Sequence, residues 1–176
     1  LFEPAPGKGF EIYETSKNIR IGVLNLMGNV FMRKSEDVFK TAKEICNKMK
    51  LKKDVDFLVV DFHGEITSEK MAAGHFFDGQ ATCVVGTHTH IPTNDARVLK
   101  NGTAYQTDAG MCGDYNSIIG MSKEPILYRF QCINSKSKFS PAMGEATICG
   151  VIIESDTETG LAKNIKPIKL GGLLGV

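Results

Sequence analysis

The chain has 176 residues, about the length of one ordinary domain, and 42% of them are hydrophobic and 23% charged. These values are typical of a globular fold and argue against disorder or collagen-like repetition. The 21 basic and 20 acidic residues leave a net charge of +1, so we expect no binding to an extended nucleic-acid duplex. We interpret residues 1–176 as a single domain.

No apolar run approaches the roughly 18 residues that a membrane helix needs, so no membrane partner is expected. The first ten residues, LFEPAPGKGF, lack the basic start and apolar stretch of a secretory signal. The five cysteines form no CxxC pair, and Cys83 and Cys149 lie in apolar, strand-like runs, which is typical of reduced, buried thiols. These features predict a cytoplasmic protein.

The first third of the chain predicts two strands and a helix. Branched and apolar residues in Phe10–Tyr13 and Ile19–Leu26 indicate strands. The segment Ser35–Lys50 is predicted to be a helix that Ser35 caps. Its apolar residues recur at helical spacing and should form one buried stripe, which comprises Val38, Ala42, Ile45 and Met49.

The middle of the chain has the pattern of a strand, a helix and a second strand. Asp56–Phe62 is a short unbroken apolar run, which favours a strand covered on both faces. A helix over Thr67–Phe77 should follow, with Thr67 as its cap, and Ala81–Gly86 repeats the buried-strand pattern. This order predicts the βαβ unit of a parallel sheet.

Two hairpins are predicted in the remaining sequence. The first joins Ala96–Leu99 to Thr103–Thr107 through an Asn-Gly turn, and the second joins Glu145–Glu154 to Leu161–Ile168. The segment between the two hairpins, Gly110–Met121, is predicted to be an irregular loop of the kind that often carries function.

Three of the four histidines directly follow the two strands with the strongest apolar pattern. His63 ends VVDFH, and His88 and His90 follow CVVGT. Ligands gather at the carboxyl ends of parallel strands, and neutral imidazole is a common metal ligand. An i, i+2 pair in extended backbone would also point both rings to one side. We therefore predict a metal site at His63, His88 and His90, although a His-x-His that only hydrogen-bonds at a loop end fits the same pattern. His75, inside the predicted helix, is interpreted as packed or exposed.

Polar neighbours could orient these histidines or contact substrate. Asp61 precedes His63 by two positions, and Glu65 follows it, so either carboxylate could accept a hydrogen bond from His63. Thr87 and Thr89 alternate with the other two histidines, and they could bind substrate oxygens or stiffen the loop.

Other catalytic motifs are absent from the sequence. It contains no P-loop, no GxGxxG after a strand, no GxSxG and no HExxH. Cys112 has no histidine placed to activate it and is interpreted as an idle thiol. The later aspartates are weaker candidates for the site; these are Asp95, Asp108 and Asp114.

The segments HGEITSEK and GTHTH, with GTAYQTDAGMCGDYNSIIGMSKE after them, resemble the YmdB-like branch of the calcineurin-like metallophosphoesterases. The resemblance extends over nearly the whole chain. It implies an α/β fold, a β-sandwich flanked by helices. It also implies a hydrolase of the bacterial phosphodiesterase kind, whose substrate is a small phosphodiester such as a 2′,3′-cyclic nucleotide.

The family resemblance further implies a binuclear metal centre. By it, His63 and His88 would bind one ion and His90 the other, and the pair would be divalent or trivalent ions of Fe, Mn or Zn. Two such ions can hold a bridging hydroxide that attacks phosphorus in line.

One part of the family pattern has no counterpart here. Members open with a strand that carries a metal-binding Asp, followed by a bridging Glu and an Asn-His pair whose histidine is the general acid, and none of these precedes His63. We therefore expect the N-terminal βαβ portion to be missing, the domain to be incomplete and the chain alone to be weakly active or inactive.

Two alternatives to an active phosphodiesterase remain open. The chain could be a non-catalytic or split-gene module that needs a partner chain to supply the missing ligands, or a mononuclear zinc hydrolase that uses all three histidines. A bared sheet edge would favour a homo-oligomer or a complex with a complementary N-terminal chain.

Overall fold

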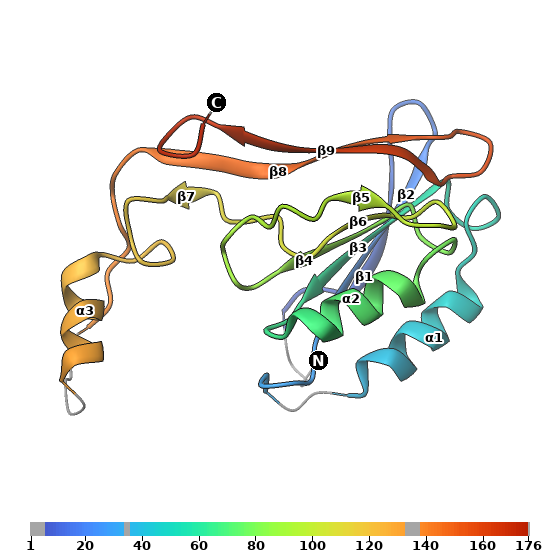
Figure 1. Ribbon diagram of the computed structural model, residues 1–176. Coiled ribbons are helices and arrows are strands. Elements are labelled where there is room, and N and C mark those ends of the chain that lie inside the picture. Colours follow the sequence, from blue (N-terminus) through green and yellow to red (C-terminus); the bar gives the residue numbers. More distant parts are fainter. Residues whose placement is uncertain (1–5, 34–35, 133–137, 176) are drawn as a thin grey trace.

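A computed structural model describes residues 6–33, 36–132 and 138–175 (Figure 1). These residues form a six-stranded sheet in the order β1-β2-β3-β4-β6-β5 and a three-stranded sheet in the order β7-β8-β9. The first sheet contains β1 (Phe10–Glu14), β2 (Arg20–Met27), β3 (Phe57–His63), β4 (Cys83–Thr87), β5 (Arg97–Val98) and β6 (Ala104–Gln106). The second contains β7 (Gly113–Asp114), β8 (Ala146–Ser155) and β9 (Ala162–Leu170), and the helices are α1 (Val38–Lys48), α2 (Thr67–Phe76) and α3 (Lys123–Gln131).

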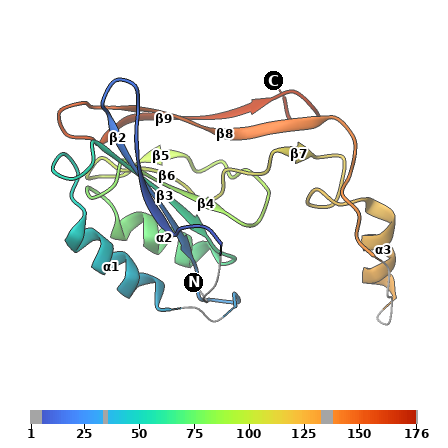
Figure 2. The ribbon, with the colours of Figure 1, turned by 180° about the vertical axis from the view of Figure 1, so that it is seen from behind.

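The two sheets and two of the helices are stacked in layers. Helices α1 and α2 cover one face of the large sheet, and the long β8–β9 ribbon crosses its other face, as both views show (Figures 1 and 2). Helix α3 lies apart from these layers, beyond β7. The expected α/β architecture, with a β-sandwich flanked by helices, is therefore confirmed.

The centre of the large sheet is parallel, as the buried apolar runs predicted. Strands β2, β3, β4 and β6 pair in parallel, whereas β1 and β5 pair antiparallel at the edges. Alternate residues such as Leu58 and Val60 are at most 1% exposed and contribute to the core against the helices. In the register, His63 pairs with Thr87, so β3 and β4 end side by side at the same edge.

The helices begin at other residues than the sequence suggested. Helix α1 is capped by Asp37, whose carboxylate accepts from the N–H groups of Phe39 and Lys40 at 3.0 Å. The expected cap Ser35 lies outside the described residues. Thr67 is the first residue of α2 and not its cap, because Ile66 occupies the cap position and makes no side-chain capping bond.

Both predicted hairpins are present, β5 with β6 and β8 with β9. Helix α3 was not predicted. All five cysteines are free; Cys83 and Cys149 are buried as expected, whereas Cys112 is exposed. Within the described part of the chain, no helix has the length and apolar character to cross a membrane.

One buried hydroxyl joins the sheet to the β8–β9 hairpin. Thr82 Oγ1 accepts from the Leu58 N–H at 2.9 Å and donates to the Gly160 carbonyl at 2.7 Å. Replacing Thr82 with Val should lower the free energy of unfolding by about 1–3 kcal/mol, since it leaves two buried backbone groups unpaired. Urea unfolding followed by circular dichroism measures this loss. Thr82→Ser, which keeps the hydroxyl, is the control and should lose less.

Candidate functional site

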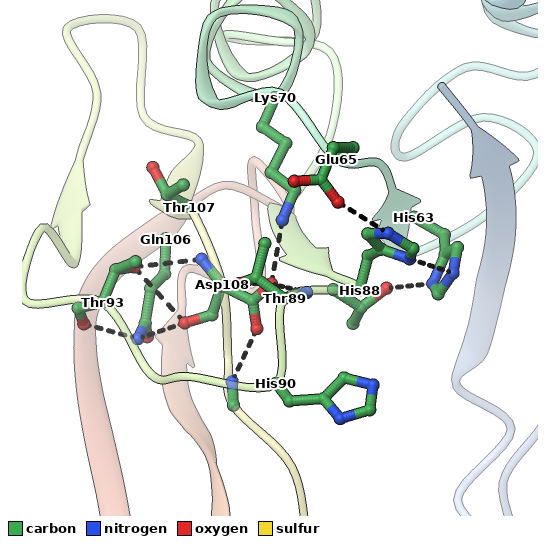
Figure 3. Close-up of polar contacts among 12 residues, drawn as sticks. His63, Glu65, Lys70, His88, Thr89, His90, Thr93, Gln106, Thr107 and Asp108 are labelled. Carbon is green, nitrogen blue, oxygen red and sulfur yellow. Dashed lines mark hydrogen bonds and ion pairs between the residues drawn. The ribbon is translucent and has the colours of Figure 1, made fainter. Parts of the chain in front are cut away.

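The rings of His63 and His88 meet at the carboxyl edge of the sheet (Figure 3). His63 is the last residue of β3, and His88 directly follows β4. His63 Nε2 lies 3.1 Å from His88 Nδ1, and the ring centroids are 4.8 Å apart. The prediction that two neighbouring strands bring these two imidazoles together is confirmed.

The tautomer of His63 follows from a chain of hydrogen bonds behind it. The Asp61 carboxylate accepts from Asn25 Nδ2 at 2.7 Å and from Thr87 Oγ1 at 2.7 Å. Since the only hydroxyl proton of Thr87 goes to Asp61, the Thr87 oxygen must accept from His63 Nδ1, 3.0 Å away. The proton of neutral His63 is therefore on Nδ1, and its Nε2 lone pair faces His88.

Glu65 fixes the tautomer of His88. Its carboxylate lies 2.9 Å from His88 Nε2, so that nitrogen carries the proton and Nδ1 of the neutral ring carries the lone pair. Two lone pairs then face each other across 3.1 Å, which requires a cation or a proton between them. This separation is close to that of two adjacent nitrogen ligands with metal–nitrogen bonds of about 2.1 Å. The His63–His88 pair thus fits two positions on one metal ion.

The electrostatics around His63 favour a neutral ring. Burial of His63 lowers its pKa below the usual value, and the neighbouring His88 lowers it further. Metal ligation needs an unprotonated imidazole, so the environment of His63 suits that role.

His90 lies in a different environment. Its Nδ1 donates to the carbonyl of Ile119 at 2.8 Å. The expected extended backbone is wrong for this loop, because His88 and His90 have φ values of 104° and 69° in the left-handed region. The i, i+2 spacing therefore cannot be used to place the two rings on one side of an extended segment.

Within the described ranges, no three His, Cys, Asp or Glu side chains form a group that could hold a metal ion. The pair of His63 and His88 is the part of the predicted site that the structure brings together, and the assignment of His63, His88 and His90 as ligands stays a prediction. A centre with all three histidines gains no support from this arrangement. His75 is exposed on α2, one of the two environments that the sequence left open.

The predicted supporting residues have more specific partners than expected. Asp61 reaches His63 only through the Thr87 hydroxyl. The ring that Glu65 contacts is that of His88. Thr89 stiffens the loop, because its N–H and hydroxyl donate to a buried carboxylate, that of Asp108.

The sequence predicts only a minor role for Asp108, and it does not indicate that Lys70 is its ion-pair partner. Asp108 and Lys70 form an ion pair of 2.8 Å, and both side chains are 1% exposed. Burial acts to raise the pKa of Asp108, but bonds from Lys70, Gly110 and Thr89 outweigh it and hold that pKa below the usual value. The signal in the sequence was slight: an aspartate just beyond a short strand, and one lysine among the charges of a helix.

A second residue that the sequence did not indicate holds the backbone of His90. The hydroxyl of Tyr115 donates to the His90 carbonyl at 3.0 Å and also lies 3.2 Å from Cys149 Sγ. Burial raises the pKa of Tyr115, and Cys149 raises it further. The predicted irregular loop thus packs on the segment that carries His90.

The apolar groove on the other face of the sheet is not part of this site. It has a volume of about 310 Å³, and no histidine lines it. Its lining residues come from β2, β3, β4, β8 and the residue before β4, and they are Ile21, Phe57, Val59, Thr82, Cys83, Ile153 and Ser155.

The parallel sheet, the ribbon across it and the paired histidines at the strand ends define an α/β protein of the calcineurin-like phosphoesterase type. The chain belongs to the YmdB-like protein family, whose pattern matches residues 1–168.

Named relatives agree with this membership. The chain is 42% identical over 166 residues to a 2′,3′-cyclic-nucleotide 2′-phosphodiesterase of Bacillus subtilis (strain 168), covering 94% of this chain and 61% of the relative. A hypothetical protein from Thermus thermophilus superposes with a TM-score of 0.87 at 37% identity, over 97% of this chain and 65% of that one. A phosphatase from Mycoplasma pneumoniae gives a TM-score of 0.82 at 37% identity, over 94% and 58%. The chain thus spans less than two thirds of each of these relatives.

Proposed function

We propose that this chain is part of a metal-dependent phosphodiesterase that hydrolyses a 2′,3′-cyclic nucleotide or a related small phosphodiester. The observation that carries the proposal is the His63–His88 pair, whose lone pairs face each other across 3.1 Å at the carboxyl edge of the sheet. The Bacillus subtilis relative named for this activity supports the substrate class.

In this proposal the chain's own residues prepare a ligand site. His63 and His88 would hold one ion of Fe, Mn or Zn, and His90 would serve a second ion through its Nε2. Asp61, acting through Thr87, and Glu65 would fix the orientation and the tautomer of the first two rings. The bound ions would supply Lewis-acid activation of water and of the phosphoryl oxygens.

The described residues supply too few ligands for catalysis, which supports a second candidate. Two imidazoles leave an ion weakly held, because oxygen ligands are needed to complete its coordination. We therefore propose that this chain alone turns over phosphodiesters slowly or not at all. A split module completed by a partner chain, or by association of copies, fits the same observation.

Metal binding by three single variants tests the histidine assignment. The purified chain should bind Zn²⁺ in a calorimetric titration, and His63→Ala and His88→Ala should each abolish that binding by removing half of the nitrogen pair. His75→Ala is the matched control, since His75 is exposed on α2 away from the pair, and it should bind as the wild type does. Undiminished binding by His88→Ala would contradict the assignment.

Complementation tests the activity. Adding the part of the Bacillus subtilis relative that this chain does not match should raise hydrolysis of a 2′,3′-cyclic nucleotide in Mn²⁺. The rise should be absent with His63→Ala and present with His75→Ala. Brisk turnover by the 176-residue chain alone would refute the need for further ligands.

A further inference from the structure

We propose that Asp108, held in place by Lys70, is a positioning residue that sets the His88–His90 loop for ligand binding. The inference rests on the proposed function, but it concerns residues that touch neither the two facing ring nitrogens nor any ligand. It assigns a role to the buried ion pair described above.

The Asp108 carboxylate is bonded on both of its oxygens. Oδ2 accepts from the Thr89 N–H at 3.0 Å, from Thr89 Oγ1 at 2.8 Å and from Lys70 Nζ at 2.8 Å. Oδ1 accepts from the Gly110 N–H at 2.9 Å. Figure 3 shows Lys70 reaching Asp108 from the helix above the sheet, with Thr89 beside the carboxylate. One side chain thus ties helix α2, the loop after β4 and the loop after β6 together.

The segment that Asp108 binds has a backbone conformation that is unfavourable for residues with a side chain. Thr89 lies between His88 and His90, whose φ values of 104° and 69° are rare for residues with a side chain. Such conformations persist only where the surrounding structure fixes them. The two bonds from Thr89 to Asp108 lie at the centre of this segment, so they hold the turn that sends the His88 ring to His63.

The ion pair with Lys70 keeps Asp108 charged, so that its carboxylate can hold Thr89. Both Asp108 and Lys70 are 1% exposed, so the charge on Asp108 depends on the ammonium group and on the bonds from Thr89 and Gly110. An asparagine has the same shape, but donors approach both carboxylate oxygens, so its amide nitrogen must face either the Gly110 N–H or the donors of Thr89 and Lys70. It also has no charge to pair with Lys70. A neutral replacement should therefore loosen Thr89 while changing little volume.

The test compares Asp108→Asn with Asp156→Asn. Asp156 is a matched control, because its carboxylate also accepts from a lysine, Lys163 at 2.7 Å, and from two backbone N–H groups, but it has no bond to the histidine loop. Long-range ¹H–¹⁵N spectra of the imidazoles report the tautomer and surroundings of His88 in the metal-free chain. Zn²⁺ titration reports the consequence for binding.

Asp108→Asn should shift the His63 and His88 imidazole signals and weaken Zn²⁺ binding by about 10- to 100-fold, the usual effect of losing a residue that orients a ligand. Asp156→Asn should leave both readouts at the wild-type values. A folded Asp108→Asn chain with unchanged signals and affinity would overturn the proposal.

A second variant decides the case if Asp108→Asn does not fold. Thr89→Val removes one donor and leaves the ion pair, and it should shift the same signals with a smaller loss of affinity. Unshifted signals in Thr89→Val would also overturn the proposal. If the wild-type chain binds no Zn²⁺, the proposed function fails, whereas the imidazole signals of the metal-free chain still decide the positioning role.

Discussion

Replacing Gly86 with alanine is expected to lower the free energy of unfolding by about 3 kcal/mol or more, the upper end of the effect of overpacking. A Cβ at this position would lie 1.8 Å from the carbonyl oxygen of Thr107 and 2.8 Å from its carbonyl carbon. It would also lie 3.1 Å from Lys70 Cδ. Because backbone atoms make the closest contacts, no rotation of a side chain can relieve the overlap.

The overlap falls where the site is assembled. Gly86 is in β4, two residues before His88, and its carbonyl accepts from the Ala109 N–H at 2.9 Å. Moving the segment around Thr107 away from β4 would carry Asp108 with it. We therefore expect Gly86→Ala to weaken Zn²⁺ binding as well as stability.

Gly150→Ala is the matched control in another strand. Gly150 lies in β8, and a Cβ there would have its nearest neighbour, Ile168 Cδ1, at 3.7 Å, which is ordinary contact. The free energy of unfolding of Gly150→Ala should equal that of the wild type or exceed it by about 0.4–1 kcal/mol, because alanine restricts the unfolded chain. Urea unfolding followed by circular dichroism at 222 nm compares the two, as the chain has no tryptophan. Equal midpoints for the two variants would contradict the steric explanation.

The parallel core could be predicted from the sequence because its signal is local and strong. Unbroken apolar runs around Val60 and Val84 need cover on both faces, and only a central strand of a layered fold offers it. Once β3 and β4 are parallel neighbours, their ends must coincide, so the meeting of His63 and His88 follows from topology.

Helix α3 could not be predicted because it lacks that signal. In this helix Ile126 is the one residue that is buried, and Phe130 is 82% exposed. Leu127 is exposed as well, so the helix has no buried apolar stripe like that of α1. Pro125 also suggests a break, although proline is tolerated in the first turn, where its missing N–H costs no helical bond.

The site was only partly predictable because its details depend on tertiary contacts. The expectation that His88 and His90 point to one side assumes an extended backbone. The sequence GTHTH gives no indication that both residues have positive φ. Lys70 has the sequence pattern of a surface charge on a helix. Its burial becomes apparent only once α2 packs over the end of β6 and Asp108 lies beneath it.

Replacing Lys70 with methionine is expected to lower the free energy of unfolding by about 3–5 kcal/mol, the cost of leaving one charge of a buried pair unmatched. Methionine keeps most of the apolar stem, so the loss reports the missing ammonium group. Lys163→Met is the matched control. Lys163 lies 2.7 Å from Asp156, a separation like the 2.8 Å of Lys70 and Asp108, but it is 65% exposed. Its removal should have a far smaller effect, because water screens that pair.

Two further measurements identify the charge as the cause of the loss. In an Asp108→Asn background, Lys70→Met should lower the free energy of unfolding by less than it does in the wild type, because no buried carboxylate is left unpaired.

The second measurement is the pH dependence of stability. The low pKa of Asp108 in the wild type contributes stability at neutral pH that is lost as pH falls through that pKa. Without Lys70 the pKa of Asp108 should rise, because one of the bonds that lower it is lost. The folded variant should then take up this proton at a higher pH than the folded wild type, so the difference between their free energies of unfolding should shrink as pH falls. If the difference in free energy of unfolding between the wild type and Lys70→Met stays constant from neutral to acidic pH, Lys70 acts through packing. The charges of the buried ion pair would then have no part in holding the histidine loop.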